Sequence, residues 1–160
     1  MKNESWTPVL VLLVGGIASG KSTVRKLIAL GAASTYGNCV SICPDDIRQE
    51  LSGDAGNQSV NKAAWDTAYS ILDAAMVARE PVIVFDAAYM VKSRTRKNMQ
   101  AYAVRHGYRV VYVILDTPIS DQYENNAQRE RRVPDDVVAR YAIDFTREFP
   151  FVIEDKKING

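Results

Sequence analysis

A run of six apolar residues followed by a glycine-rich segment constrains this chain more than any other feature. Residues 9–14 read Val-Leu-Val-Leu-Leu-Val, the length and branched composition of a strand buried on both faces of a parallel sheet. The next eight residues match G-x-x-x-x-G-K-[ST], in which backbone N–H groups and a helix N-terminus face phosphate oxygens. The segment predicts a nucleotide-binding loop made by Gly15, Gly16, Ile17, Ala18, Ser19, Gly20, Lys21, Ser22 and Thr23.

Individual residues of this loop have distinct expected roles. Lys21 can reach the β- and γ-phosphates of a nucleoside triphosphate, and the Ser22 hydroxyl can bind Mg²⁺. Thr23 is expected to pack within the following helix rather than to act as a second metal ligand. ATP or another nucleoside triphosphate is therefore the expected donor, with Mg²⁺ as cofactor. A glycine-rich turn beside a surface lysine is the plain structural alternative.

Strands and helices alternate along the sequence. Strands are predicted at 9–14, 40–43, 81–86, 108–115 and 151–153, and helices at 21–30, 46–51, 60–79, 93–106, 119–130 and 134–148. Gly31 is expected to end the first helix, and Asp45 or Asp46 to cap the second. The order predicts an α/β fold, a doubly wound parallel sheet of the P-loop NTPase/kinase type flanked by helices, with ligands at the carboxyl ends of the strands.

Length and composition narrow the class of protein. The 160 residues fit one domain spanning residues 1–160, and the net charge of +1 neither favours nor excludes a nucleic-acid partner. Cys39 and Cys43 are expected to be reduced core residues of a cytoplasmic protein. The longest apolar run is far short of the roughly 20 residues of a membrane span, and the N-terminus has no signal-peptide pattern.

Two carboxylates and an arginine follow the predicted second strand, in the segment Cys43-Pro44-Asp45-Asp46-Ile47-Arg48. At that edge of the sheet they are expected to lie beside the γ-phosphate of a bound nucleotide. A carboxylate there can accept the proton of an attacking hydroxyl, and an arginine one helical turn later can hold a phosphate of the acceptor. Alternatively, the two aspartates act only as helix N-caps, with Arg48 as a solvated neighbour.

A second acidic position and a basic stretch follow in the chain. Asp86 ends the predicted third strand, where its carboxylate can meet Mg²⁺ or an acceptor hydroxyl, or cap the next helix. Residues 87–115 contain six Lys and Arg and no Asp or Glu, with tyrosines interleaved. Such a segment suits a nucleic-acid backbone and its bases, with Arg94 as a candidate acceptor contact; a solvated helix face explains the same pattern.

An arginine-rich turn separates the last two predicted helices. Arg129, Arg131 and Arg132 precede Pro134, after the fourth strand and one helix. In a P-loop kinase a segment at this place closes over the nucleotide and supplies charge to the transferring phosphoryl group. The simpler interpretation is a charged helix end followed by a proline at the first position of the next helix. The position favours a short arginine-rich lid.

These features together resemble the kinase domain of phage-type 5′-hydroxyl polynucleotide kinases, over roughly residues 9–147. They are the loop at 15–22, the sequence Asp45-Asp46-Ile47-Arg48, the strand end Val84-Phe85-Asp86 and the arginine-rich turn before Val133-Pro134. The resemblance implies that Asp45 is the general base and that Arg48 contacts the 3′-phosphate of the acceptor. It also implies that Arg129 contacts the donor phosphates, with Arg132 as the next candidate.

The sequence therefore predicts a kinase that transfers the γ-phosphoryl group to a hydroxyl of a nucleic acid, in the first place a polynucleotide 5′-OH. A DNA kinase acting on a hydroxymethylated base of the 5-hydroxymethyluridine type is one alternative, because Ala87 and Ala88 stand where the family has polar residues. A kinase of nucleosides, nucleotides or other small molecules is another. A nucleotide-binding ATPase or switch module that phosphorylates no acceptor is a third, and a switch would not need an acceptor base at Asp45.

Overall fold

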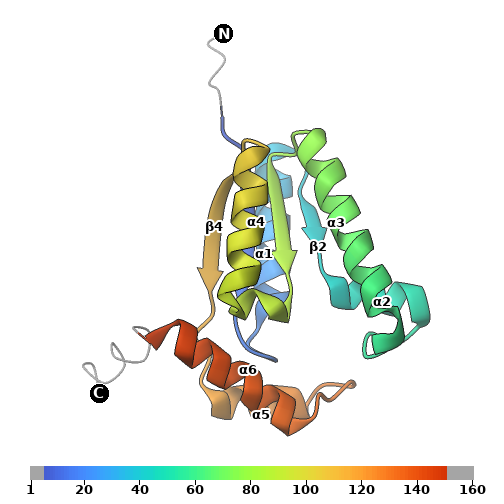
Figure 1. The fold of residues 1–160 in the computed structure, drawn as a ribbon, viewed down its shortest axis with the longest axis vertical. Coiled ribbons are helices and arrows are strands. Elements are labelled where there is room, and N and C mark those ends of the chain that lie inside the picture. Colours follow the sequence, from blue (N-terminus) through green and yellow to red (C-terminus); the bar gives the residue numbers. More distant parts are fainter. Residues whose placement is uncertain (1–5, 151–160) are drawn as a thin grey trace.

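Four parallel strands form the central sheet of the computed structural model, which describes residues 6–150 (Figure 1). β1 (Val9–Val14) lies between β3 (Val82–Asp86) and β4 (Arg109–Ile114), and β2 (Val40–Ile42) pairs with the other side of β3. The spatial order is β2-β3-β1-β4. Strands that are neighbours along the chain are joined by helical crossovers, as the predicted parallel sheet requires.

Helices cover both faces of this sheet. α1 (Lys21–Tyr36) packs on one face, where its apolar residues meet alternate residues of β1 and β3. α3 (Asn61–Val77) and α4 (Ser93–Arg105) pack on the other face, in a larger apolar cluster that contains the remaining residues of β1. Successive side chains of a strand point to opposite faces, so a continuous apolar run such as β1 is expected where both faces are covered. The doubly wound architecture is confirmed.

The other elements gather at the carboxyl ends of the strands. α2 (Pro44–Ser52) follows β2, and the short 3₁₀ segments η1 (Gln58–Val60) and η2 (Ala88–Val91) precede α3 and α4. α5 (Ile119–Ala127) and α6 (Asp135–Glu148) lie beyond the arrowheads of the strands in Figure 1. Residues that directly follow the strands therefore lie at the edge of the sheet where these helices are placed.

The first helix is longer than predicted, because Gly31 does not end it. α1 continues to Tyr36, and Gly37 ends it in the left-handed conformation with φ 83° while its N–H donates to the carbonyl oxygen of Ala33. A glycine inside a helix costs only about 1 kcal/mol relative to alanine, which the packed face of α1 readily offsets.

Two other helix ends also differ from the prediction. The N-cap of α2 is Cys43, and Asp45 and Asp46 lie within the first turn, where neither caps the helix. Proline at the first helical position sets this start, and the acidic pair faces the positive end of the helix dipole. α5 ends at Ala127, so Arg129 lies in the loop after the helix.

Three further expectations concern the chain as a whole. The strand predicted at 151–153 lies outside the described residues. Cys39 and Cys43 are free thiols. Cys43 is buried, as expected of a core residue, and burial raises its pKa to about 12, whereas Cys39 is only half-buried. None of the helices within residues 6–150 combines the length and apolar character that crossing a membrane requires.

Candidate active site

The predicted nucleotide-binding loop joins β1 to α1 through two residues in the left-handed conformation. Ala18 and Gly20 have positive φ values of 56° and 96°, which turn the backbone sharply before α1. The Ser19 hydroxyl donates to the carbonyl oxygen of Gly16 at 2.8 Å. Lys21 Nζ donates to the carbonyl oxygens of Gly15 at 3.0 Å and Gly16 at 2.5 Å. The lysine is thus folded over the loop in which phosphate oxygens are expected to bind.

The segment after β4 holds this loop in place, which sequence reasoning missed. The Thr117 hydroxyl donates to the carbonyl oxygen of Ser19 at 2.7 Å, and Asn125 Nδ2 donates to that of Ala18 at 3.1 Å. Gln122 packs so closely against Gly16 that a side chain on Gly16 would collide with its Oε1 atom. The sequence offered one signal that could have found these contacts, namely that a polar residue, Thr117, comes soon after a predicted strand.

A first cavity of about 520 Å³ opens beside the loop. Lys21, Ser22, Thr23 and Asp86 line it, whereas Gly15 and Gly16 are buried and do not line it. Thr23 is exposed on this cavity, so the expectation that it packs within the helix is wrong. The full lining is Ile17, Ala18, Ser19, Gly20, Lys21, Ser22, Thr23, Cys43, Asp45, Asp46, Gln49, Ala55, Asp86, Ala87, Ala88, Asn125, Arg129 and Arg131.

Asp86 lines this cavity, and Arg25, which does not line it, is its buried partner. Asp86 ends β3 and is 3% exposed; burial raises its pKa, and the charges of Lys21 and Arg25 oppose the rise. Arg25 Nε lies 3.3 Å from Asp86 Oδ2, and Arg25 NH2 lies 2.8 Å from Asp46 Oδ2. Sequence reasoning missed Arg25, although its position four residues after Lys21 places both on one side of α1.

The residues present fit a magnesium ion held mainly by a nucleotide. Within residues 6–150 no group of three or more His, Cys, Asp and Glu side chains comes together to bind a metal. Mg²⁺ commonly takes only one or two protein ligands, with water and phosphate oxygens completing the shell. Ser22 and Asp86 line the same cavity. Asp86 Oδ2 is buried and makes no hydrogen bond, although Arg25 Nε lies 3.3 Å away as an ion-pair partner.

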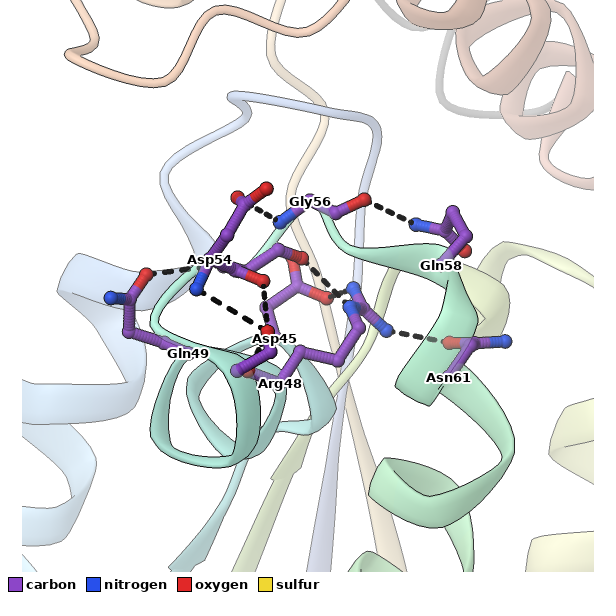
Figure 2. Close-up of polar contacts among 9 residues, drawn as sticks. Asp45, Arg48, Gln49, Asp54, Gly56, Gln58 and Asn61 are labelled. Carbon is purple, nitrogen blue, oxygen red and sulfur yellow. Dashed lines mark hydrogen bonds and ion pairs between the residues drawn. The ribbon is translucent and has the colours of Figure 1, made fainter.

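Asp45 and Arg48 are paired on α2 (Figure 2). Arg48 is 7% exposed and donates to the carbonyl oxygen of Ala55 at 2.8 Å, to Asn61 Oδ1 at 2.7 Å and to Asp45 Oδ1. The same network fixes the turn after α2, where the Gly56 N–H donates to Asp54 Oδ1 at 2.7 Å. Arg48 is therefore an internal brace that holds the Asp45 carboxylate, and not a solvated neighbour.

A second cavity of about 600 Å³ adjoins the first. Asp45, Arg129 and Arg131 line both cavities, whereas Asp46 lines only the first. Three aromatic rings form one side of the second cavity: Trp65 meets Tyr89 edge-on at 5.9 Å between ring centroids, and Tyr89 meets Tyr141 at 6.4 Å. Its basic side chains are Arg48, Lys92, Arg129, Arg131, Arg132 and Arg140, against Asp45 and Asp144.

The residues of the basic stretch that was predicted to contact an acceptor lie in three different environments. Lys92 lines the second cavity, where its Nζ lies 3.5 Å from Asp144 Oδ2. Arg94 is exposed on α4 and lines neither cavity. Arg96 points inward, donating to the carbonyl oxygens of Met90 and Val91 and pairing with Glu148 at 3.0 Å.

The lid loop, residues 128–134, joins α5 to α6 and carries three arginines. Arg129 and Arg131 face both cavities, while Arg132 lines only the second cavity and makes two hydrogen bonds to the Asp135 carboxylate at 3.0 and 3.1 Å. The side chain of Asn126, which is fully buried, closes the base of the loop. Its Nδ2 donates to the carbonyl oxygen of Val133 at 2.7 Å, and its Oδ1 accepts from the Val133 N–H at 3.0 Å.

A parallel sheet with this loop between its first strand and helix defines a P-loop domain of the NTPase/kinase type. Residues 10–149 match the AAA_33 family, described as an AAA domain, and the chain belongs to that family. No curated protein matches the sequence.

Solved structures share the fold at low sequence identity. A chain of the Pnkp1/Rnl/Hen1 RNA repair complex is 19% identical with a TM-score of 0.75, over 92% of this chain and 47% of its own length. A second structure of the Pnkp1/Rnl/Hen1 complex gives 19% identity and a TM-score of 0.63, over 84% and 43%. A chain of the PezAT toxin–antitoxin system of Streptococcus pneumoniae is 18% identical with a TM-score of 0.58, over 92% and 65%. This protein thus spans about half the length of the first two chains.

Proposed function

We propose that this protein transfers the γ-phosphoryl group of ATP, or of another nucleoside triphosphate, to a hydroxyl group of a nucleic acid, first of all to a 5′-hydroxyl end. The observation that carries the proposal is the position of Asp45 on the wall common to the two cavities. One cavity adjoins the nucleotide-binding loop, and the other is lined by cations and aromatic rings. A carboxylate between donor and acceptor serves a kinase, whereas a nucleotide-binding switch has no acceptor hydroxyl to deprotonate there.

The proposed reaction is a direct transfer. The acceptor oxygen attacks the γ-phosphorus, the bond between that phosphorus and the β,γ-bridging oxygen breaks, and the nucleoside diphosphate leaves. Asp45 accepts the proton of the attacking hydroxyl. Arg48 orients the Asp45 carboxylate, and from the wall of the second cavity it is also placed to contact a phosphate of the acceptor.

Cations from α1 and from the lid loop act on the donor phosphates. Lys21 exchanges its bonds to the loop carbonyls for bonds to the β- and γ-phosphates, and Arg129 approaches the same phosphates from the lid loop. Arg131 borders both cavities, so it joins Arg129 ahead of Arg132 as a lid contact to the donor. Ser22 and Asp86 would hold magnesium, which when bound neutralises charge on the β- and γ-phosphate oxygens.

Two features of the second cavity support a nucleic-acid acceptor. Its cations outnumber its carboxylates, which suits a phosphodiester backbone, and its rings from Trp65, Tyr89 and Tyr141 suit the stacking of a base. The structural neighbour in an RNA repair complex agrees with such an acceptor.

One observation favours a second candidate, a kinase of free nucleosides or nucleotides. Arg131 lies against Gly56, where a side chain on the glycine would meet Arg131 Nε at 3.0 Å. The lid loop thus reaches the turn after α2 and bridges the second cavity. A bridged cavity of about 600 Å³ matches a single nucleotide.

Transfer of label from γ-labelled ATP to a panel of acceptors tests the proposal. The panel contains 5′-hydroxyl DNA and RNA oligonucleotides, duplex DNA with hydroxymethylated bases, and free nucleosides and nucleotides. Labelling of the oligonucleotide ends is the expected result. Labelling confined to modified bases or to free nucleosides would show that the protein is a kinase with a different acceptor from the one proposed. ATP hydrolysis without any labelled acceptor would contradict the proposed phosphoryl transfer.

A further inference from the structure

Arg25 is a buried cation that joins two carboxylates at the carboxyl edge of the sheet. Its side chain is 10% exposed and belongs to α1, one turn after Lys21. NH2 lies 2.8 Å from Asp46 Oδ2, Nε lies 3.3 Å from Asp86 Oδ2, and NH1 lies 3.4 Å from the Ser41 hydroxyl. Arg25 thereby links α1 to the ends of β2 and β3. It lines neither cavity, so it is not placed to touch a substrate.

Without this partner the Asp86 carboxylate would be a buried charge next to a lysine. Asp86 is 3% exposed, and it lines the first cavity together with Lys21. Among the charged neighbours of Lys21, Asp86 acts most strongly on the lysine pKa, raising it against the lowering caused by burial. Opposite charges attract far more strongly in a buried site than in water, so an unpartnered Asp86 would draw the ammonium group of Lys21 towards itself.

Lys21 in fact binds neutral groups. Its Nζ donates to the carbonyl oxygens of Gly15 and Gly16, and no ion pair with a carboxylate is found for it among residues 6–150. Hydrogen bonds to carbonyls are weaker than bonds to a carboxylate and are readily exchanged for bonds to phosphate oxygens. These hydrogen bonds therefore hold the lysine in place, but no carboxylate neutralises its positive charge.

We propose that Arg25 is a positioning residue that holds Asp86 away from Lys21 and so keeps the lysine available for the phosphates of the donor. Asp46 binds the NH2 atom of the same guanidinium group, which gives the second acidic residue of the Asp45-Asp46 pair a role distinct from that of the first. The inference rests on the nucleotide binding of the proposed function and is independent of the acceptor.

The test is a double-mutant cycle measured on ATP binding without metal. Calorimetry in the presence of EDTA compares the unchanged protein with Arg25→Met, Asp86→Asn and the double variant. Arg25→Met is expected to weaken ATP binding about tenfold or more, because Lys21 becomes paired with Asp86. Asp86→Asn removes a negative charge near the triphosphate and is expected to tighten binding in either background, but at least about fivefold more where Arg25 is absent.

Two further variants separate charge from packing. Arg25→Lys keeps a positive charge beside Asp46 and Asp86 and is expected to bind ATP within about threefold of the unchanged protein, whereas a packing role would make lysine as harmful as methionine. Lys26→Met removes an exposed charge of the same helix and is expected to change little. If Arg25→Met does not fold, as judged by circular dichroism, the cycle is run with Arg25→Gln.

The outcomes distinguish this inference from the proposed function. Coupling between Arg25 and Asp86 of less than about twofold, in an unchanged protein that binds ATP, would overturn the positioning role alone. Failure of the unchanged protein to bind any nucleoside triphosphate, with or without magnesium, would contradict the proposed function and this inference together.

Discussion

Replacing Asp45 with asparagine is expected to lower phosphoryl transfer steeply and to leave ATP binding close to that of the unchanged protein. Asparagine keeps the size of the side chain and can still accept a hydrogen bond from Arg48, but it cannot take up the proton of the acceptor. Loss of a general base typically lowers a rate about 10²–10⁴-fold. ATP binding changes little, because Asp45 lies where the two cavities meet and not in the nucleotide-binding loop.

The structure also predicts that this variant folds. The Asp45 side chain is 53% exposed, and its pair with Arg48 contributes at most about 1 kcal/mol to the free energy of unfolding. Arg48 keeps its bonds to Ala55 and Asn61, so its buried charge is not left without partners. The thermal midpoint of unfolding should therefore shift by only a few degrees.

Single-turnover transfer to a 5′-hydroxyl oligonucleotide is the assay, with ATP binding measured separately. Asp46→Asn is the matched control: Asp46 borders only the first cavity and is bound to Arg25, so we expect less than about a tenfold fall in rate. A severe defect in Asp46→Asn beside a mild one in Asp45→Asn would refute the assignment of the base.

Three other outcomes follow from the same geometry. Lys21→Ala should lower turnover by about 10²-fold or more without unfolding the protein, since its charge acts on the transferring phosphoryl group; turnover within about threefold of normal would contradict this. Burial raises the folded-state pKa of Asp86 above its usual 3.8, so this carboxyl binds more protons when folded, and its contribution to the free energy of unfolding falls as pH rises from about 4. In urea unfolding, the free energy of unfolding of Asp86→Asn should rise relative to that of the unchanged protein as the pH increases from about 4. The opposite trend would refute the raised pKa of the buried Asp86 carboxyl. Replacing Arg131 and Arg132 together with glutamine should reduce the slope of log K against log salt for oligonucleotide binding by up to about two units, whereas a flat salt dependence in the unchanged protein would remove a polynucleotide from the account.

The elements nearest the loop were predictable because their signals are local. A continuous apolar run, a complete phosphate-binding motif and a helix follow one another within residues 9–30, and each restricts its own backbone. The error at Gly31 arose because glycine is a weak helix breaker: whether it ends a helix depends on the tertiary packing beyond it. Gly37 ends α1 instead, in a left-handed conformation that glycine adopts without strain.

The supporting contacts of the site could not be predicted, because they join residues far apart in the chain. Arg25 reaches Asp46 and Asp86 only because β2 and β3 are neighbours in the sheet, and the sequence does not state that order. Composition likewise could not separate Arg94, which is exposed, from Arg96, which is bound to Glu148 and stacks on Phe149 with its guanidinium carbon 4.7 Å from the ring centroid. A run of positive charge identifies a surface only once the helix face is known.

The most direct measurement of the central claim is transfer of the γ-phosphoryl group to a defined hydroxyl. One oligonucleotide is prepared in two forms, with a 5′-hydroxyl and with a 5′-phosphate, and each is incubated with γ-labelled ATP, magnesium and the protein. We expect label at the 5′ end of the first form, none on the second, and loss of the signal in Asp45→Asn. Equal labelling of both forms, or labelling that survives Asp45→Asn undiminished, would contradict it.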